Sequence, residues 1–199
     1  MTKPTALLTA EDILPNAVFL ERRPRLEREV IRNKEARRVA LGPNLTFLFE
    51  NKVTLGWQIQ EMCRVEQISA PEAVKHELDT YNALLPGPNE LTATLLVEYE
   101  EAGERDRMLA KLLGLQNHVR LEIEGQEPVQ AAFDAEQYNM KRISSVQFVR
   151  FALLPGQVDA LCDLRRRATL VCDHSAYAAR CELTGAARGA LVEDLLAGR

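Results

Sequence analysis

The sequence lacks the short motifs that mark most nucleotide-binding, hydrolase and metalloprotease sites. It contains no Gly-x-x-x-x-Gly-Lys-[Ser/Thr], no Gly-x-Gly-x-x-Gly, no Gly-x-Ser-x-Gly and no His-Glu-x-x-His. Its four cysteines form no Cys-x-x-Cys pair, which excludes the usual zinc-ribbon, thioredoxin-like and iron–sulfur spacings. We therefore expect no cofactor and no metal, and an enzyme with this sequence would need an unconventional site.

Long apolar segments are also missing. No stretch approaches the roughly 20 consecutive apolar residues that a membrane-spanning helix needs, so we expect no membrane partner. Residues 1–14 hold one lysine, short apolar runs and two acidic residues, without the long apolar centre of a secretion signal. We expect a cytoplasmic protein whose thiols are reduced.

A strong charge of either sign is absent as well. The net charge of −4 on 199 residues argues against a nucleic-acid partner. The charge is uneven only over residues 21–38, which hold eight basic and four acidic side chains. A solvated helix face with internal ion pairs is the favoured interpretation of that run, and a patch for phosphate or an acidic partner is the alternative.

The composition that remains is that of an ordinary globular protein, with 46% hydrophobic and 27% charged residues. Apolar periodicity predicts helices over residues 24–38, 54–67, 69–84, 101–113, 155–164 and 185–196. Alternating patterns predict strands over residues 45–50, 91–99, 119–123, 127–133, 145–153, 168–173 and 179–183. We predict an α+β fold, with a mostly antiparallel sheet and helices packed on one face, in a single domain over residues 1–199.

Residues 51–60 fit two different structures. Apolar residues at every second position from Val53 to Ile59 alternate as in a strand, and residues 51–52 could form the turn of a hairpin. Leu55, Ile59 and Met62 also recur at the helical period, with Thr54 as a candidate cap. We favour the helix.

Residues 172–177, CDHSAY, concentrate reactive side chains. On a strand, Cys172 and His174 share a face, and a returning strand brings Cys181 alongside. With His118 added, two thiolates and two imidazoles could bind zinc. The favoured interpretation is that both cysteines are small core residues, because free cysteine is among the most buried residue types.

Asp173, His174 and Tyr177 also suggest an acid–base site. A carboxylate beside an imidazole, with a phenol nearby, can transfer protons. Adjacent residues on a strand point to opposite faces, so Asp173 orients His174 only if the strand has already ended. Simple roles in a turn are therefore favoured over catalysis.

Polar side chains gather on the expected helix 54–67. Gln58, Glu61 and Arg64 could bind a polar ligand or a partner, or they could form a buried network that fixes packing, and the structural role is favoured. Tyr81 and Asn82 end the next helix, with Asn82 expected in the left-handed conformation.

Four distinctive stretches together carry a family resemblance: FENKVTLGWQIQEMCRVEQI (49–68), ELDTYNALLPGPNELTATL (77–95), SSVQFVRF (144–151) and DHSAY (173–177). They resemble a bacterial family of similar-length proteins catalogued as a domain of unknown function, and the QIQEM run at 58–62 is the most specific part. The resemblance implies a single domain without assigned catalysis. Gene neighbours in that family imply a redox or peroxide-stress pathway, with an iron–sulfur or rubrerythrin-like protein as partner.

One residue departs from the family's pattern. Gln147 stands where Ser-Ser-Val-His-Phe would place a histidine, which weakens a histidine-based metal site. The leading interpretation is a non-catalytic accessory or binding protein that uses residues 58–66 and 22–38 as contact surfaces.

The rival interpretation is a small metal-binding protein or enzyme that uses His174, Asp173, Tyr177 and His118. Convergence of His118, Arg150, His174 and Glu61 on one pocket would favour it.

Overall fold

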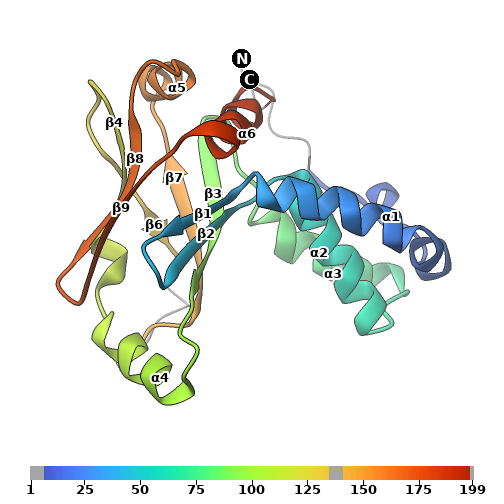
Figure 1. Ribbon diagram of the computed structural model, residues 1–199. Helices are drawn as coiled ribbons and strands as arrows, with labels where there is room; N and C mark the ends of the chain where they lie inside the picture. The colour runs from blue at the N-terminus through green and yellow to red at the C-terminus, as the bar shows by residue number, and fades with distance from the viewer. Residues whose placement is uncertain (1–6, 135–140, 198–199) are drawn as a thin grey trace.

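Helices and antiparallel strands form separate layers. The computed structural model describes residues 7–134 and 141–197. Figure 1 shows the strands on one side of the molecule and a layer of helices that projects from the other. The α+β class and the antiparallel pairing are confirmed, although the strands form two sheets where we expected one.

Sheet A has five strands in the order β1-β2-β3-β7-β6, and every neighbouring pair is antiparallel. Its strands are β1 (Arg38–Leu41), β2 (Leu45–Phe49), β3 (Glu90–Val97), β7 (Val146–Ala152) and β6 (Ala132–Phe133). Sheet B has four antiparallel strands in the order β5-β4-β8-β9. Its strands are β5 (Val129–Gln130), β4 (Val119–Ile123), β8 (Ala168–His174) and β9 (Tyr177–Glu182).

The main hydrophobic core contains apolar side chains from both sheets. Phe47 and Phe151 of sheet A and Leu121 and Leu170 of sheet B are at most 1% exposed and belong to one cluster. Burial of such side chains is the dominant favourable contribution to folding. One face of sheet A packs against sheet B in this core. The opposite face, here called the outer face, can carry polar groups.

The chain passes between the sheets at Ala131. Strand β5 pairs with β4 in sheet B, whereas β6 pairs with β7 in sheet A. The Ala131 amide donates to the Val119 carbonyl at 3.0 Å. The single strand expected over residues 127–133 is therefore two short strands.

Three helices form a second layer beside sheet A: α1 (Asn16–Glu35), α2 (Lys52–Val65) and α3 (Pro71–Asn82). They surround a smaller apolar cluster that contains Leu55, Ile59 and Leu78. The remaining helices are η1 (Ala10–Asp12), α4 (Ala102–Lys111), η2 (Leu115–Asn117), α5 (Pro155–Cys162) and α6 (Gly185–Ala197). None of the helices in the described ranges is long and apolar enough to cross a membrane.

Helix α2 resolves the ambiguity at residues 51–60 in favour of a helix, but its cap is not Thr54. The Asn51 side chain accepts hydrogen bonds from the amides of Val53 and Thr54, both at 3.0 Å. The cap thus lies three residues before the predicted one. Thr54 completes the cap, because its hydroxyl oxygen accepts from the Asn51 amide at 3.0 Å, and the hydroxyl proton can still be donated elsewhere.

The prediction for the first long helix was wrong at both ends. Helix α1 begins at Asn16 and ends at Glu35, and residues 38–41 form strand β1. Pro24 lies inside the helix rather than in its first turn. Proline removes a hydrogen bond to the carbonyl four residues earlier, but both Pro24 and Leu20 are exposed, so water can bind that carbonyl.

Candidate functional site

Strand register places two cross-strand rows, each containing a threonine, on the outer face of sheet A. Thr94 of β3 pairs with Leu48 of β2 on one side and with Phe148 of β7 on the other. Thr92, two residues earlier on β3, pairs with Arg150 of β7. Residues two apart on a strand point to the same side, so both rows face away from the main core.

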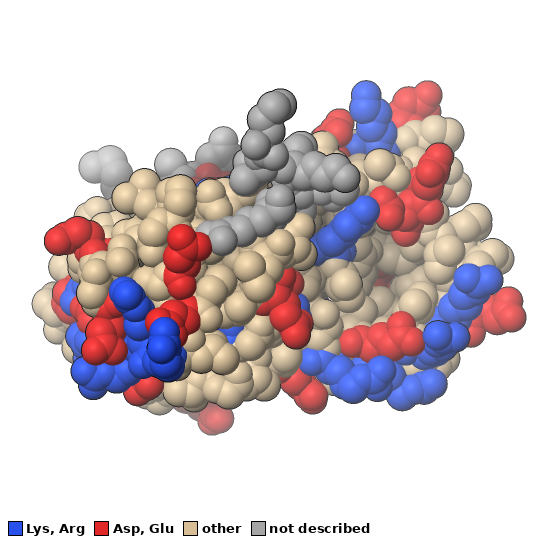
Figure 2. All heavy atoms as spheres, turned by 90° about the horizontal axis from the view of Figure 1, so that it is seen from above, with Lys and Arg blue, Asp and Glu red and all other residues tan. Residues whose placement is uncertain are grey.

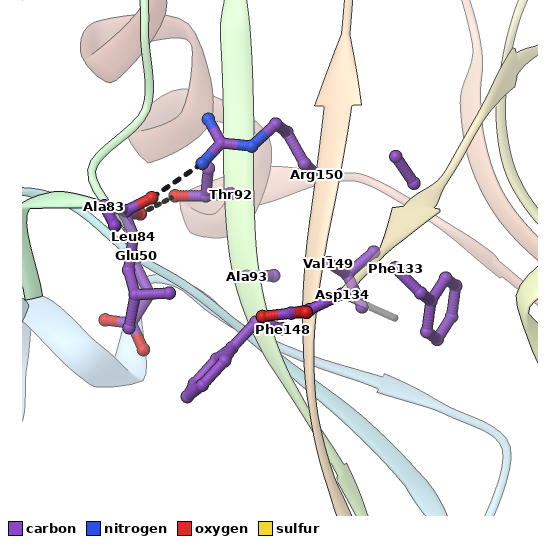
Figure 3. A pocket seen from close by; sticks show the side chains of 11 residues that line it. Glu50, Ala83, Leu84, Thr92, Ala93, Phe133, Asp134, Phe148, Val149 and Arg150 are labelled. Carbon is purple, nitrogen blue, oxygen red and sulfur yellow. Dashed lines mark hydrogen bonds between the residues drawn. The ribbon is translucent and has the colours of Figure 1, made fainter. Parts of the chain in front are cut away.

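A cavity of about 280 Å³ lies over this face, next to the end of helix α3 (Figure 3). Residues from five separate parts of the chain line it. They are Glu50, Ala83, Leu84, Thr92, Ala93, Ala132, Phe133, Asp134, Phe148, Val149 and Arg150. A concave site with apolar walls and a few convergent polar groups is the usual form of a small-molecule pocket.

Glu50 is the most unusual residue of this pocket. It follows β2 and precedes the Asn51 cap of α2, and it is only 3% exposed. Its carboxylate accepts a hydrogen bond from Thr94 Oγ1 at 2.6 Å and a short one from the Thr54 hydroxyl. The Gln58 side-chain amide donates to Glu50 Oε1 at 3.3 Å. Neutral donors therefore surround a buried acid.

Within residues 7–134 and 141–197, no lysine, arginine or histidine forms an ion pair with Glu50. Buried carboxylates are normally paired with a cation or bound to a metal, because an uncompensated buried charge is costly. Gln58 belongs to the polar set predicted on helix 54–67, so one member of that set contacts Glu50 of the pocket.

Arg150 also lines the pocket, but its charge is already balanced. Its guanidinium forms a short ion pair with Glu90 and donates to the Ala83 carbonyl at 2.8 Å (Figure 3). Glu90 is on β3 and is not among the lining residues. The guanidinium thus tightens the pocket wall and adds little net positive charge to it.

Glu61 and Arg64 act elsewhere, between helices α1 and α2. Glu61 accepts from Arg23 at 2.7 Å and from Arg64 at 2.7 Å. Partial burial alone would raise the pKa of Glu61, but the hydrogen bonds from the two arginines outweigh it and lower the pKa below the ordinary value. This network holds α1 against α2.

Side-chain amides of the helices clamp the N-terminal segment. The Gln60 amide bonds both the amide and the carbonyl of Leu14, and Asn82 bonds both groups of Leu8, all at 2.8–2.9 Å. Asn82 lies within α3 and does not adopt the predicted left-handed conformation, because its side chain is needed in this clamp. Tyr81 packs against the helical cluster, and burial raises its pKa.

His118 and Asp173 meet on sheet B. Asp173 Oδ1 lies 2.9 Å from His118 Nδ1, and Arg120 binds the other carboxylate oxygen at 2.5 Å. Hydrogen bonds from His118, and then from Arg120, lower the pKa of Asp173. As expected from the alternation of strand residues, Asp173 is exposed while His174 is buried, so Asp173 orients His118 instead of His174.

His174 and Tyr177 use their polar atoms to hold the fold. His174 Nδ1 accepts from the Ala176 amide, so Nε2 carries the proton and donates to the Leu113 carbonyl, both at 3.1 Å. The Tyr177 hydroxyl donates to the Leu41 carbonyl at 2.6 Å and thereby ties sheet B to the β1–β2 turn. Both side chains are occupied by main-chain partners.

The cysteines do not form a ligand set with these histidines. Cys172 is 1% exposed, and burial raises the pKa of its thiol. In the described part of the chain, no group of three or more histidine, cysteine, aspartate or glutamate side chains could hold a metal ion. Arg150, Glu61 and His174 also make separate contacts on different elements, and no shared pocket follows from them.

The sequence analysis missed the central residue, Glu50. One signal was present: an acidic residue closes the apolar strand run LTFLFE and directly precedes a helix cap. Thr94 gave no signal, because a threonine is common in strands.

Fold and pocket together define an α+β protein with two antiparallel sheets and a carboxylate-containing pocket beside a helical layer. The chain matches the family described as "Protein of unknown function (DUF3501)" over residues 7–195, and it belongs to that family. It is 30% identical to a protein described as a novel protein of unknown function from Burkholderia pseudomallei K96243, with a TM-score of 0.89. That match covers 96% of this chain and 100% of the other. No curated protein matches the chain.

Proposed function

We propose that this protein is a non-catalytic accessory protein that acts by binding, and that its small-molecule site is the Glu50 pocket. The observation that carries the proposal is the buried carboxylate of Glu50, whose hydrogen-bond donors in the described ranges are all neutral. Keeping such a charge out of water costs several kcal/mol unless a partner compensates it. A bound ligand would supply that compensation.

A binding role also fits the chemistry of the residues that could have been catalytic. His174 and Tyr177 bond to main-chain groups, as described above. The alternative of a small enzyme keeps one supporting contact, the hydrogen bond between His118 and Asp173. A general acid or base needs a free proton-transfer atom aimed at a substrate, and His174 and Tyr177 do not supply one because their polar atoms bond to the main chain.

The redox or peroxide-stress association would operate through a partner. Burial raises the pKa of the Cys63, Cys172 and Cys181 thiols, which disfavours the reactive thiolate form in each. A contribution to redox chemistry would then come from binding an iron–sulfur or rubrerythrin-like protein, as the family's gene neighbours imply. These three thiols would not exchange electrons.

The exposed arginines of helix α1 are the proposed contact surface for that partner. Arg22, Arg25 and Arg28 are exposed, and Figure 2 shows charged side chains gathered at the end of the molecule where the helical layer lies. Exposed charges of this kind steer a partner of opposite sign and make association sensitive to salt.

Calorimetric titration of the purified chain with a purified rubrerythrin-like protein tests the surface. Arg22→Glu with Arg25→Glu should abolish the heat of binding, and no heat with the unchanged chain would reject the partner.

A thermal-shift screen tests the pocket itself. Cationic, anionic and neutral small molecules are added to the unchanged protein and to the Glu50→Gln variant. A ligand at about 100 times its Kd stabilises the folded state by about 2.7 kcal/mol. For a chain of this length that raises Tm by roughly 5–10 °C. At least one class should stabilise the unchanged protein and not the variant, and a screen in which no class does so would reject a small-molecule role.

A further inference from the structure

We propose that the ligand of the Glu50 pocket is an organic ammonium compound, with a protonated amine that binds Glu50 and an apolar body that lies against the pocket wall. This inference rests on the proposed binding function, and it specifies the chemical class that the pocket selects.

The first reason is the state of the Glu50 carboxylate. Its contacts are two hydroxyl groups, from Thr54 and Thr94, and one amide, from Gln58. These groups donate hydrogen bonds but carry no charge, so they orient the carboxylate and, among the residues that the structure describes, leave it without a cationic partner. A carboxylate can accept about four hydrogen bonds. A bound ammonium can therefore donate to the acceptor position of Glu50 that these three groups leave unfilled. Charge-assisted hydrogen bonds of this kind are stronger than neutral ones.

The second reason is the balance of charge along the rest of the lining. The guanidinium of Arg150, which lines the pocket, is paired with Glu90. The carbonyl of Ala83 is another acceptor at the same wall. Acceptors and negative charge therefore predominate, which favours a cationic ligand and disfavours an anionic one.

The third reason is the apolar part of the wall. Leu84 and Phe148 line the cavity, and Figure 3 shows the Phe148 ring extending toward the side of the pocket on which Glu50 lies. An aromatic ring attracts a cation and also covers an apolar chain. A cavity of about 280 Å³ accepts a molecule of modest size, such as an aryl- or alkylamine.

The test compares three compounds that share one skeleton and differ in charge. 2-Phenylethylamine is the cation, 2-phenylethanol the neutral analogue and 3-phenylpropanoate the anion. Each is titrated into the full chain, and binding is followed by calorimetry and by chemical-shift changes of the pocket amides. The amine should bind at least about tenfold more tightly than either analogue, which is the range expected for one charge-assisted hydrogen bond.

Two variants assign the selectivity to the pocket. Glu50→Gln keeps the shape of the side chain and removes its charge, and it should weaken amine binding about tenfold or more without strengthening the alcohol equally. Glu98→Gln is the matched control, because Glu98 lies at the end of the same sheet but lines a different cavity, and it should leave amine binding unchanged. Circular dichroism establishes that each variant is folded. Should Glu50→Gln fail to fold, the comparison of the three compounds on the unchanged protein still decides the outcome.

The outcomes separate the ligand class from the binding function. Tighter binding of the alcohol or the carboxylate at the pocket would overturn the ammonium assignment and leave the pocket as a binding site. Absence of binding by the amine at millimolar concentration would also overturn the assignment, and the broader screen would then decide whether the pocket binds anything. Amine binding that is equal in the Glu50→Gln variant would place the amine elsewhere and overturn the assignment as well.

Discussion

Removal of the Asp194 carboxylate should destabilise the protein more than almost any other single charge deletion. Arg37 lies between helix α1 and strand β1, and Asp194 lies on helix α6. Arg37 Nε and Nη2 bind the two carboxylate oxygens at 2.7 and 2.9 Å. The Asn51 side chain donates to the same carboxylate at 3.3 Å. The pair therefore joins the C-terminal helix to the junction of the helical layer and sheet A.

The expected magnitude follows from the burial of the pair. The two side chains are 7% and 15% exposed. Asp194→Ala leaves the Arg37 guanidinium buried without its counter-ion, and breaking a buried pair in this way costs about 3–5 kcal/mol. For a chain of 150–250 residues each kcal/mol lowers Tm by about 2–4 °C, so Tm should fall by roughly 6–20 °C.

Urea unfolding followed by circular dichroism measures the free-energy change. Glu29→Ala is the control, because it breaks the exposed pair with Arg25 and should change the free energy of unfolding by under about 0.5 kcal/mol. Replacing both buried partners, as Arg37→Met with Asp194→Leu, should recover most of the loss. A loss of less than about 1 kcal/mol for Asp194→Ala would refute the reasoning, since it would be close to the roughly 0.5 kcal/mol range of surface substitutions.

Three further outcomes are expected. Tyr177→Phe should lower the free energy of unfolding in urea by about 1–2 kcal/mol, because the buried Leu41 carbonyl loses its donor, and an unchanged midpoint would contradict that role. Cys63 and Cys172 should resist a thiol-reactive probe at pH 8 until urea unfolds the chain, since burial raises the pKa of both thiols, and rapid labelling of the native protein would show that they are accessible. The folded-state pKa of Glu61 is lowered from 4.5, so its stabilising contribution is present above pH 4.5 and is lost as the pH falls below it. The stability difference between the unchanged protein and Glu61→Gln should therefore shrink in acid, and a difference independent of pH would contradict the network.

Periodicity predicted most elements because local patterns were strong. The strand over 91–99 and the helix over 69–84 correspond to β3 and α3. Strand β1 was missed because it contributes only two buried residues, Val39 and Leu41, directly after a charged helix. Two apolar positions are too few to distinguish a strand from the last turn of a helix.

The division into two sheets depends on information that no local pattern contains. Residues 127–133 alternate in the same way whether they join β4 or β7, and the structure uses both partners, with the change at Ala131. Partner choice comes from long-range packing of the two apolar faces. Sequence alternation specifies which side of a strand is buried, but not which sheet the strand extends.

The contacts of the candidate site also depend on long-range pairing that the sequence pattern does not contain. Gln58 was selected because an amide near a carboxylate and a guanidinium is unusual on a central helix, and the expected neighbours were Glu61 and Arg64. In the structure Gln58 donates instead to Glu50, eight residues earlier, across the junction between β2 and α2. Thr94 joins them only because β2 and β3 pair in one register, with Leu48 opposite Thr94. A shift of that register by one residue would turn Thr94 into the core and leave Glu50 without its hydroxyl donor. Assembly of the pocket is therefore a consequence of strand pairing.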